Sequence, residues 1–115
     1  MRKGKMVAQG AHASMAVFFN RMEQCDSNPT SFSLDVTQAM ATWMSGSFTK
    51  ICVGVNSEAE LLAVYEAAKR NGIAASLIQD AGHTEFNGVP TYTAVAVGPD
   101  ESIVIDPITG NLSLL

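Results

Sequence analysis

Apolar residues recur at spacings of three and four between residues 5 and 23, at Ala8, Ala11, Met15, Phe18 and Met22. This period predicts a helix with one apolar stripe. Beside the stripe, Lys5, Gln9 and His12 recur at the same kind of spacing. At about 100° per residue, these three side chains lie within roughly 60° of one another. One edge of the predicted helix therefore carries an ammonium, an amide and an imidazole in a row.

The stretch from residue 50 to residue 79 predicts a strand, a helix and a second strand. Residues 50–55 (KICVGV) form a β-branched apolar run, and Ser57 with Glu60 matches a capping box that begins a helix. Residues 74–79 are the second strand, and a connection of this length joins parallel strands. Residues 92–97 add a third. We therefore expect an α/β fold: a small mixed, largely parallel sheet in a three-layer arrangement, with helices packed on its faces.

The other segments are predicted from breakers and caps. Residues 24–33 are polar and contain Asn28-Pro29, which predicts a loop. Residues 34–44 are predicted to form a second helix. Asn71-Gly72 ends the helix that follows Ser57. Residues 103–105 fit either a short strand or a turn of helix.

The composition is that of one domain, and we expect residues 1–115 to form it. The 115 residues are 47% hydrophobic and 16% charged, which argues against disorder. No apolar run approaches the roughly 20 residues of a membrane helix, and no signal peptide is visible. We therefore expect a cytoplasmic protein that does not associate with membranes.

Charge and cysteine content narrow the chemistry. Seven Lys+Arg against eleven Asp+Glu give a net charge of −4, which excludes a polycation that coats nucleic acid but not a local basic site. Arg2, Lys3 and Lys5 form such a cluster. Cys25 and Cys52 lack metal-type spacing, and Cys52 is expected to pack as a small hydrophobe. Because HExxH, GxGxxG and paired Cys/His motifs are absent, we expect neither a metal nor a cofactor.

The segment Asp80-Ala81-Gly82-His83-Thr84 directly follows a predicted strand. Open α/β sheets bind ligands at the carboxyl ends of their strands, where Asp80 could orient a water and Gly82 allow a close approach. The alternative is an ordinary turn in which Asp80 caps a loop and Thr84 bonds the local backbone. The polar helix edge has a similar alternative, since such side chains are often simply solvated.

Together the two segments resemble a known family. Lys3-Gly4-Lys5, then Ala8-Gln9 and Ala11-His12, looks like the KGK-x-x-AQ-x-AHA signature of the type 2 peptidyl-tRNA hydrolases. Ile78-Gln79-Asp80-Ala81-Gly82 with Thr84 resembles the I-x-DAG-x-T motif of that family. The segment from Ile105 to Gly110 resembles its C-terminal signature. The matches occur in family order and cover essentially the whole chain.

The resemblance implies hydrolysis of the ester between a peptide, or an N-blocked aminoacyl group, and the 3′-terminal ribose of tRNA. Lys5 matches the family's essential lysine and would supply positive charge. Asp80 would orient or deprotonate the attacking water, and Thr84 would position it. His12 is a second candidate base, and the choice between Asp80 and His12 stays open.

For such a hydrolase we expect a substrate-binding set, with Arg21 as a further phosphate contact: Arg2, Lys3, Gln9, Gly82 and Thr93. His83 stands where many members carry an arginine. The family's β-strand before the KGK helix has no counterpart here, so we expect an N-terminally truncated chain. Two alternatives to the hydrolase are a non-catalytic RNA- or protein-binding relative and a small hydrolase of another ester. A homodimer is left open.

Overall fold

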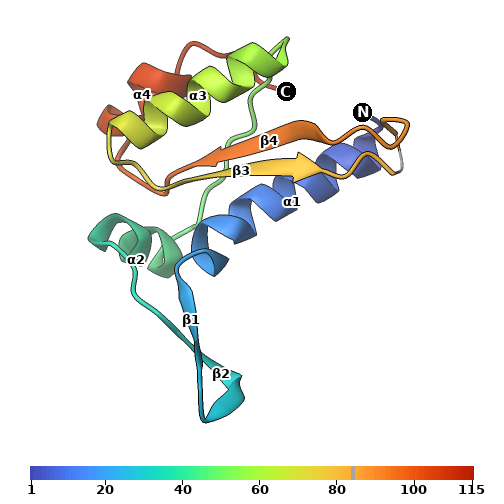
Figure 1. Cartoon of the computed structure of the whole chain (residues 1–115). Coiled ribbons are helices and arrows are strands. Elements are labelled where there is room, and N and C mark those ends of the chain that lie inside the picture. Colours follow the sequence, from blue (N-terminus) through green and yellow to red (C-terminus); the bar gives the residue numbers. More distant parts are fainter. Residues whose placement is uncertain (84) are drawn as a thin grey trace.

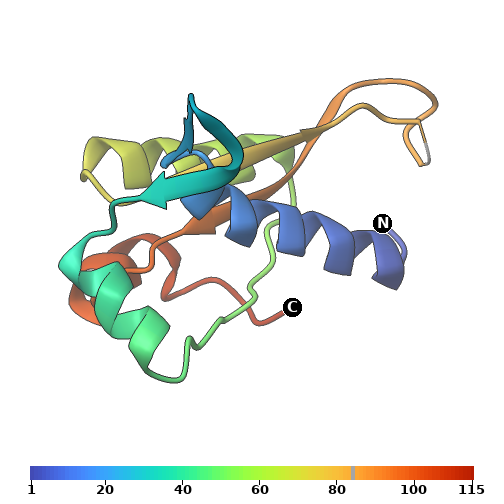
Figure 2. The same ribbon diagram turned by 90° about the horizontal axis from the view of Figure 1, so that it is seen from below.

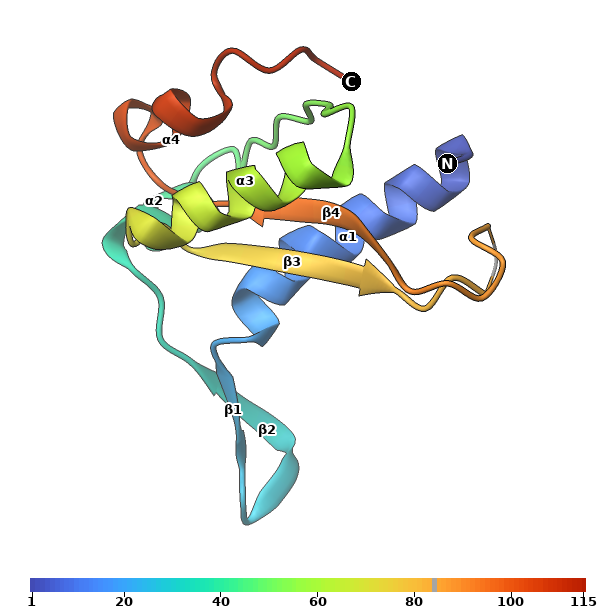
Figure 3. The ribbon, with the colours of Figure 1, turned by 45° about the horizontal axis from the view of Figure 1, so that its top comes forward.

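Two long strands lie between two layers of helices in the computed structural model, which describes residues 1–83 and 85–115 (Figure 1). The strands are β3 (Ala75–Asp80) and β4 (Thr91–Val97). Helix α1 (Lys3–Phe19) packs on one face of the pair. Helix α3 (Glu58–Arg70) packs on the other face, with α4 (Ser102–Thr109) beside it. The three-layer arrangement in Figures 1 and 3 is therefore helix, strand pair, helix.

The strand pair carries the core. β3 and β4 are antiparallel, with Ala75 opposite Val97 and Asp80 opposite Thr91, and residues 81–90 join them. The buried apolar residues that pack around it come from the helices and from the turn after α3: Ala13, Val17, Met40, Ala68 and Ile73. The buried Ser76 hydroxyl on β3 donates a hydrogen bond to the carbonyl of Ala13. This bond holds α1 against the strands.

The predicted mixed, largely parallel sheet is wrong. The described residues form two separate two-stranded antiparallel sheets, β1–β2 and β3–β4. Residues 50–55 form no strand beside β3: their pairing is an isolated antiparallel bridge between Val53 and Leu114. α3 does connect this segment to β3, but a crossover makes parallel neighbours only when both strands bond within one sheet. Here β3 bonds to β4 instead. Cys52 is exposed, so its expected packing is also wrong.

The predicted loop at 24–33 is largely a hairpin. β1 (Met22–Cys25) pairs with β2 (Asn28–Leu34) in an antiparallel register that shifts between Gln24 and Cys25. The hairpin projects away from the body in Figures 1 and 3, and nearly all of its residues are exposed. Its polar sequence lacks the alternation that a half-buried strand shows, which explains why periodicity missed it.

Local capping signals located two helices. The Ser57 hydroxyl accepts from the backbone N–H of Glu60 at 3.1 Å, which confirms the predicted start of α3. Gly72, at φ +67°, ends α3 as predicted. α2 (Gln38–Ser45) begins later than predicted, because its cap is Thr37. Residues 103–105 belong to α4, so of the two alternatives the helix is the correct one.

The buried face of α1 is not the predicted apolar stripe. Its buried residues are Gln9, Ala13 and Val17, spaced by four, whereas Ala8, Ala11 and Met15 are exposed. Figure 2 shows α1 along the underside of the strand pair. The small Ala13 permits close approach, and the Gln9 amide finds a partner on β4, so burying this face leaves no unpaired polar group.

Candidate functional site

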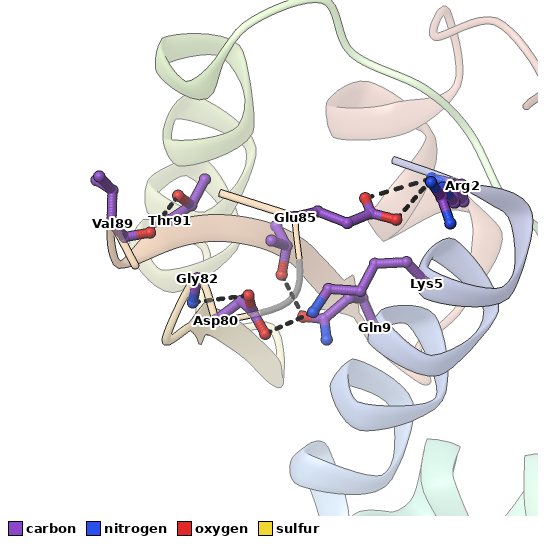
Figure 4. A network of polar contacts seen from close by, with 9 residues as sticks. Arg2, Lys5, Gln9, Asp80, Gly82, Glu85, Val89 and Thr91 are labelled. Atoms are coloured by element: carbon purple, nitrogen blue, oxygen red, sulfur yellow. Dashed lines mark hydrogen bonds and ion pairs between the residues drawn. The ribbon is translucent and has the colours of Figure 1, made fainter. Parts of the chain in front are cut away.

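Lys5 and Asp80 form an ion pair between the first turn of α1 and the last residue of β3 (Figure 4). Lys5 Nζ lies 2.9 Å from Asp80 Oδ1. Their side chains are 14% and 16% exposed, so both groups are partly desolvated and still reachable from solvent. The structure thus brings together the two residues that head the sequence-based prediction.

The second oxygen of Asp80 has its own donor. Asp80 Oδ2 accepts from the backbone N–H of Gly82 at 2.9 Å. The hydrogen bond from Lys5 and then that from Gly82 lower the pKa of Asp80 below its ordinary value, because both favour the ionised form. Asp80 is therefore an oriented carboxylate at neutral pH. Each of its oxygens keeps a lone pair that could accept from a water.

Gly82 shapes the turn that presents this donor. Its φ is +85°, a conformation that L side chains rarely adopt. A Cβ atom at this position would overlap the backbone of Val89, on the far side of the loop. The glycine thus serves the close approach of two loop segments, and the Gly82 N–H reaches Asp80 as a result.

Gln9 and Thr93 meet beneath the ion pair. The Thr93 hydroxyl on β4 donates to Gln9 Oε1, one helical turn after Lys5. Gln9 is only 4% exposed. The contact therefore joins α1 to β4 in the interior. Gln9 thus does not belong to a solvent-facing helix edge with His12.

Of four other predicted site residues, three are exposed and one lies outside the described residues. His12 is exposed, and no described residue forms a hydrogen bond or ion pair with it. It follows Lys5 by two helical turns, a rise of about 10 Å. Arg2 and Lys3 are exposed at the start of α1. Thr84 lies outside the described residues.

Sequence reasoning missed one contact at the site. Both carboxylate oxygens of Glu85 accept from the backbone N–H of Arg2, at 3.3 and 3.4 Å (Figure 4). The first turn of α1 contains no acidic residue of its own, and the side chain of its N-cap, Arg2, makes no capping hydrogen bond. That missing acid was the available signal, since helix N-termini favour carboxylates.

Three further features bound the site. Among residues 1–83 and 85–115, no cluster of three or more His, Cys, Asp or Glu is placed to hold a metal ion. No helix in the same described part of the chain is long and apolar enough to cross a membrane. A cavity of about 510 Å³ lies at the opposite end of α1 and includes Arg21 and Lys69 in its lining, but none of the residues around Asp80.

Comparison with known proteins identifies the family of this chain. A family model described as peptidyl-tRNA hydrolase PTH2 matches residues 1–115. A peptidyl-tRNA hydrolase of Methanocaldococcus jannaschii is 43% identical over 115 residues, which cover 100% of this chain and 90% of that protein. One of Methanothermobacter thermautotrophicus is 39% identical, with 100% and 89% covered, and one of Haloquadratum walsbyi is 38% identical, with 99% and 88% covered. This chain therefore belongs to the type 2 peptidyl-tRNA hydrolase family.

Proposed function

We propose that this chain hydrolyses the ester that joins a peptide, or an N-blocked aminoacyl group, to the 3′-terminal ribose of tRNA. The family and the names of its archaeal relatives support the reaction. The observation that carries the proposal is the partly exposed ion pair of Lys5 and Asp80, since ester hydrolysis needs an oriented water and a positive charge beside the developing oxyanion.

Lys5 is proposed to supply the positive charge, and Asp80 to orient the water. The Lys5 ammonium would act on the carbonyl oxygen of the ester or on the adjacent phosphate. Because its pKa is lowered, Asp80 is a weak base but a dependable acceptor for a water hydrogen. The proton of that water would leave to solvent or to the exposed imidazole of His12, which is kept as the second candidate base. The Thr84 hydroxyl would position the same water.

Gln9 and Thr93 are proposed to act on the substrate through the position of α1. Gln9 is buried, and its hydrogen bond with Thr93 fixes the helix one turn below Lys5. Displacing a reacting group by about 1 Å can cost a hundredfold in rate. This interior bond therefore supports the placement of the ammonium.

The tRNA is proposed to bind through the cations at the start of α1. Arg2 and Lys3 are exposed there, beside Lys5. Arg21 lies just past the other end of α1, whose 17 residues span roughly 26 Å, a distance that a polynucleotide can bridge. Contacts of this kind go to phosphates, so binding should depend on salt and little on base sequence.

The non-catalytic alternative draws on the net charge of −4, which is unusual for a protein that binds RNA. The compartment and the oligomeric state of the protein are proposals as well. We propose a cytoplasmic enzyme, because its substrate belongs to translation. A homodimer is the proposed alternative to a monomer, and the mass of the protein in solution would decide between them.

The test is single-turnover cleavage of N-acetylaminoacyl-tRNA by the purified chain. K5A and D80N should each lose about a hundredfold or more in rate, the usual cost of removing a group that stabilises developing charge. R70A, which removes an exposed cation at the end of α3, outside the cavity that Arg21 lines, is the matched control and should retain full activity. Binding of tRNA without cleavage would favour the non-catalytic relative, and activity that ignores salt would favour an ester unrelated to nucleic acid.

A further inference from the structure

Among the described residues, two contacts link the end of β3 and the loop that follows it to α1. One link is the ion pair of Asp80 with Lys5. The other is Glu85, whose carboxylate accepts from the backbone N–H of Arg2 across 83 positions of sequence. Figure 4 shows Glu85 beside the start of α1, on the same side as Lys5.

Helix α1 needs this carboxylate because its own sequence supplies none. In a capping box, the residue three after the N-cap carries the carboxylate that binds the N-cap N–H. Here the N-cap is Arg2 and that third position is Lys5, whose ammonium bonds Asp80 instead. The turn also carries Lys3, so three cations meet the positive end of the helix dipole. Glu85 therefore supplies from a distant segment the cap that α1 lacks.

The loop is closed on itself, so the two links act as one. The carbonyl of Gly82 accepts from the backbone N–H of Phe86 at 3.3 Å and of Gly88 at 2.9 Å. The N–H of Val89 donates to the carbonyl of Phe86 at 2.9 Å. The same Gly82 donates its N–H to Asp80. Fixing the position of Glu85 thus also fixes Gly82, and through it the Asp80 carboxylate that faces Lys5.

Resting on the proposed function, we propose that Glu85 is a positioning residue of the hydrolase: it fastens the β3–β4 loop to α1 and so holds Asp80 against Lys5. Its charge has a second consequence. A carboxylate beside Arg2, Lys3 and Lys5 weakens the attraction of that cluster for phosphate. The residue therefore raises the rate of the bound substrate and lowers the affinity for tRNA.

Two substitutions separate these effects. E85Q keeps an oxygen that can accept from Arg2 and removes the charge, whereas E85A removes both. E66Q, an exposed acid on α3, removes the same charge from the other face of the strand pair and serves as the control. The three variants and the wild type are compared by kcat and KM for N-acetylaminoacyl-tRNA at low salt. The amide proton of Arg2 is followed in each by NMR hydrogen exchange.

For E85A we expect kcat about tenfold lower, the rate equivalent of one charge-assisted hydrogen bond, together with a lower KM. E85Q should keep kcat within about twofold, since its amide oxygen preserves the cap, and should also show the lower KM. A purely structural role would reduce the active fraction without lowering KM. E66Q should match the wild type in both constants.

Wild-type kcat in E85A overturns the inference, and so does a kcat in E85Q as low as that of E85A. An unchanged KM in both variants overturns the part that concerns tRNA affinity. The Arg2 amide should be protected in the wild type and E85Q and exchange rapidly in E85A. A wild-type chain that cleaves no substrate overturns the proposed function alone, because Arg2 exchange and the affinity for deacylated tRNA still decide for or against Glu85.

Discussion

Lys5 Nζ lies 2.9 Å from Asp80 Oδ1, so an ion pair joins the first turn of α1 to the end of β3 across 75 positions of sequence. Both side chains are partly buried and partly accessible. A pair this close has two consequences that can be measured separately. One concerns how the two groups share catalysis, and the other concerns the titration of the carboxylate.

The two residues should act as a unit in catalysis. Removing either partner leaves the other misplaced, so effects of residues in one site are strongly non-additive. The double variant K5A/D80N should therefore be no less active than the less active of the two single variants. Single-turnover rates of all four proteins give the coupling directly. Losses that multiply in the double variant would contradict a shared role.

The lowered pKa of Asp80 makes stability depend on pH in a defined direction. The hydrogen bond from Lys5 is the main cause, so the pKa in the folded chain lies below the unfolded value of about 3.9. The stabilisation is then fully present above that unfolded value and is lost as the pH falls through the folded value. The free energy of unfolding of the wild type should exceed that of D80N at neutral pH. Urea denaturation at acidic pH should give a smaller difference in the free energy of unfolding between the two proteins. A difference that does not change with pH would contradict the ion pair.

Gly82 should tolerate substitution less well than Gly88 in the same loop. Both have positive φ, at +85° and +77°, so alanine at either costs about 1 kcal/mol through its Cβ atom. At Gly88 the Cβ meets nothing within 4 Å, whereas at Gly82 it overlaps Val89. G82A should therefore destabilise by about 2 kcal/mol more than G88A and should alone reduce kcat. Chemical denaturation and the cleavage assay check both parts, and equal effects would show that the close approach is unimportant.

Sequence predicted the elements that local signals control. The start of α3 just after Ser57 and its end just before Asn71-Gly72 depend on residues a few positions apart, and both were predicted correctly. The pairing of strands depends on contacts that periodicity does not report. The run at 50–55 has the composition of a buried strand, yet its bridge is to Leu114 near the C-terminus. The parallel sheet failed for that reason.

At the site, too, local features could be predicted from the sequence and long-range contacts could not. The sequence placed Lys5 on a helix and Asp80 at the end of a strand, but only the family resemblance suggested that they meet. The buried position of Gln9 was not predicted. Its side chain can be buried because Thr93 donates a hydrogen bond to it, and Thr93 lies 84 positions away in the sequence. Glu85 was missed because its role depends on what the start of α1 lacks.

Affinity for tRNA should fall with salt, with a slope set by the cations of α1. Each phosphate contact contributes about 0.9 to the slope of log K against log salt, or about 0.7 for a single strand. R2A and K3A should each reduce the slope by about 1 and weaken binding similarly for tRNAs of different sequence. R70A, an exposed cation at the end of α3, is the control and should leave the slope unchanged. Binding titrations at several salt concentrations check this, and a slope that survives both substitutions would place the tRNA elsewhere.

The bond between Gln9 and Thr93 should matter for stability in proportion to its burial. T93V keeps the shape of the side chain but leaves the buried amide oxygen of Gln9 without its donor, which costs about 1–3 kcal/mol. T91V, on the same strand, removes an exposed hydroxyl that bonds the carbonyl of Val89 and should cost below about 0.5 kcal/mol. The double variant Q9L/T93V replaces both partners by apolar groups and should recover most of the loss, because no orphaned polar atom remains. Equal urea midpoints for T93V and T91V would contradict a stabilising role of the buried bond. If the double variant recovers stability but has a reduced kcat, Gln9 acts in catalysis by positioning Lys5.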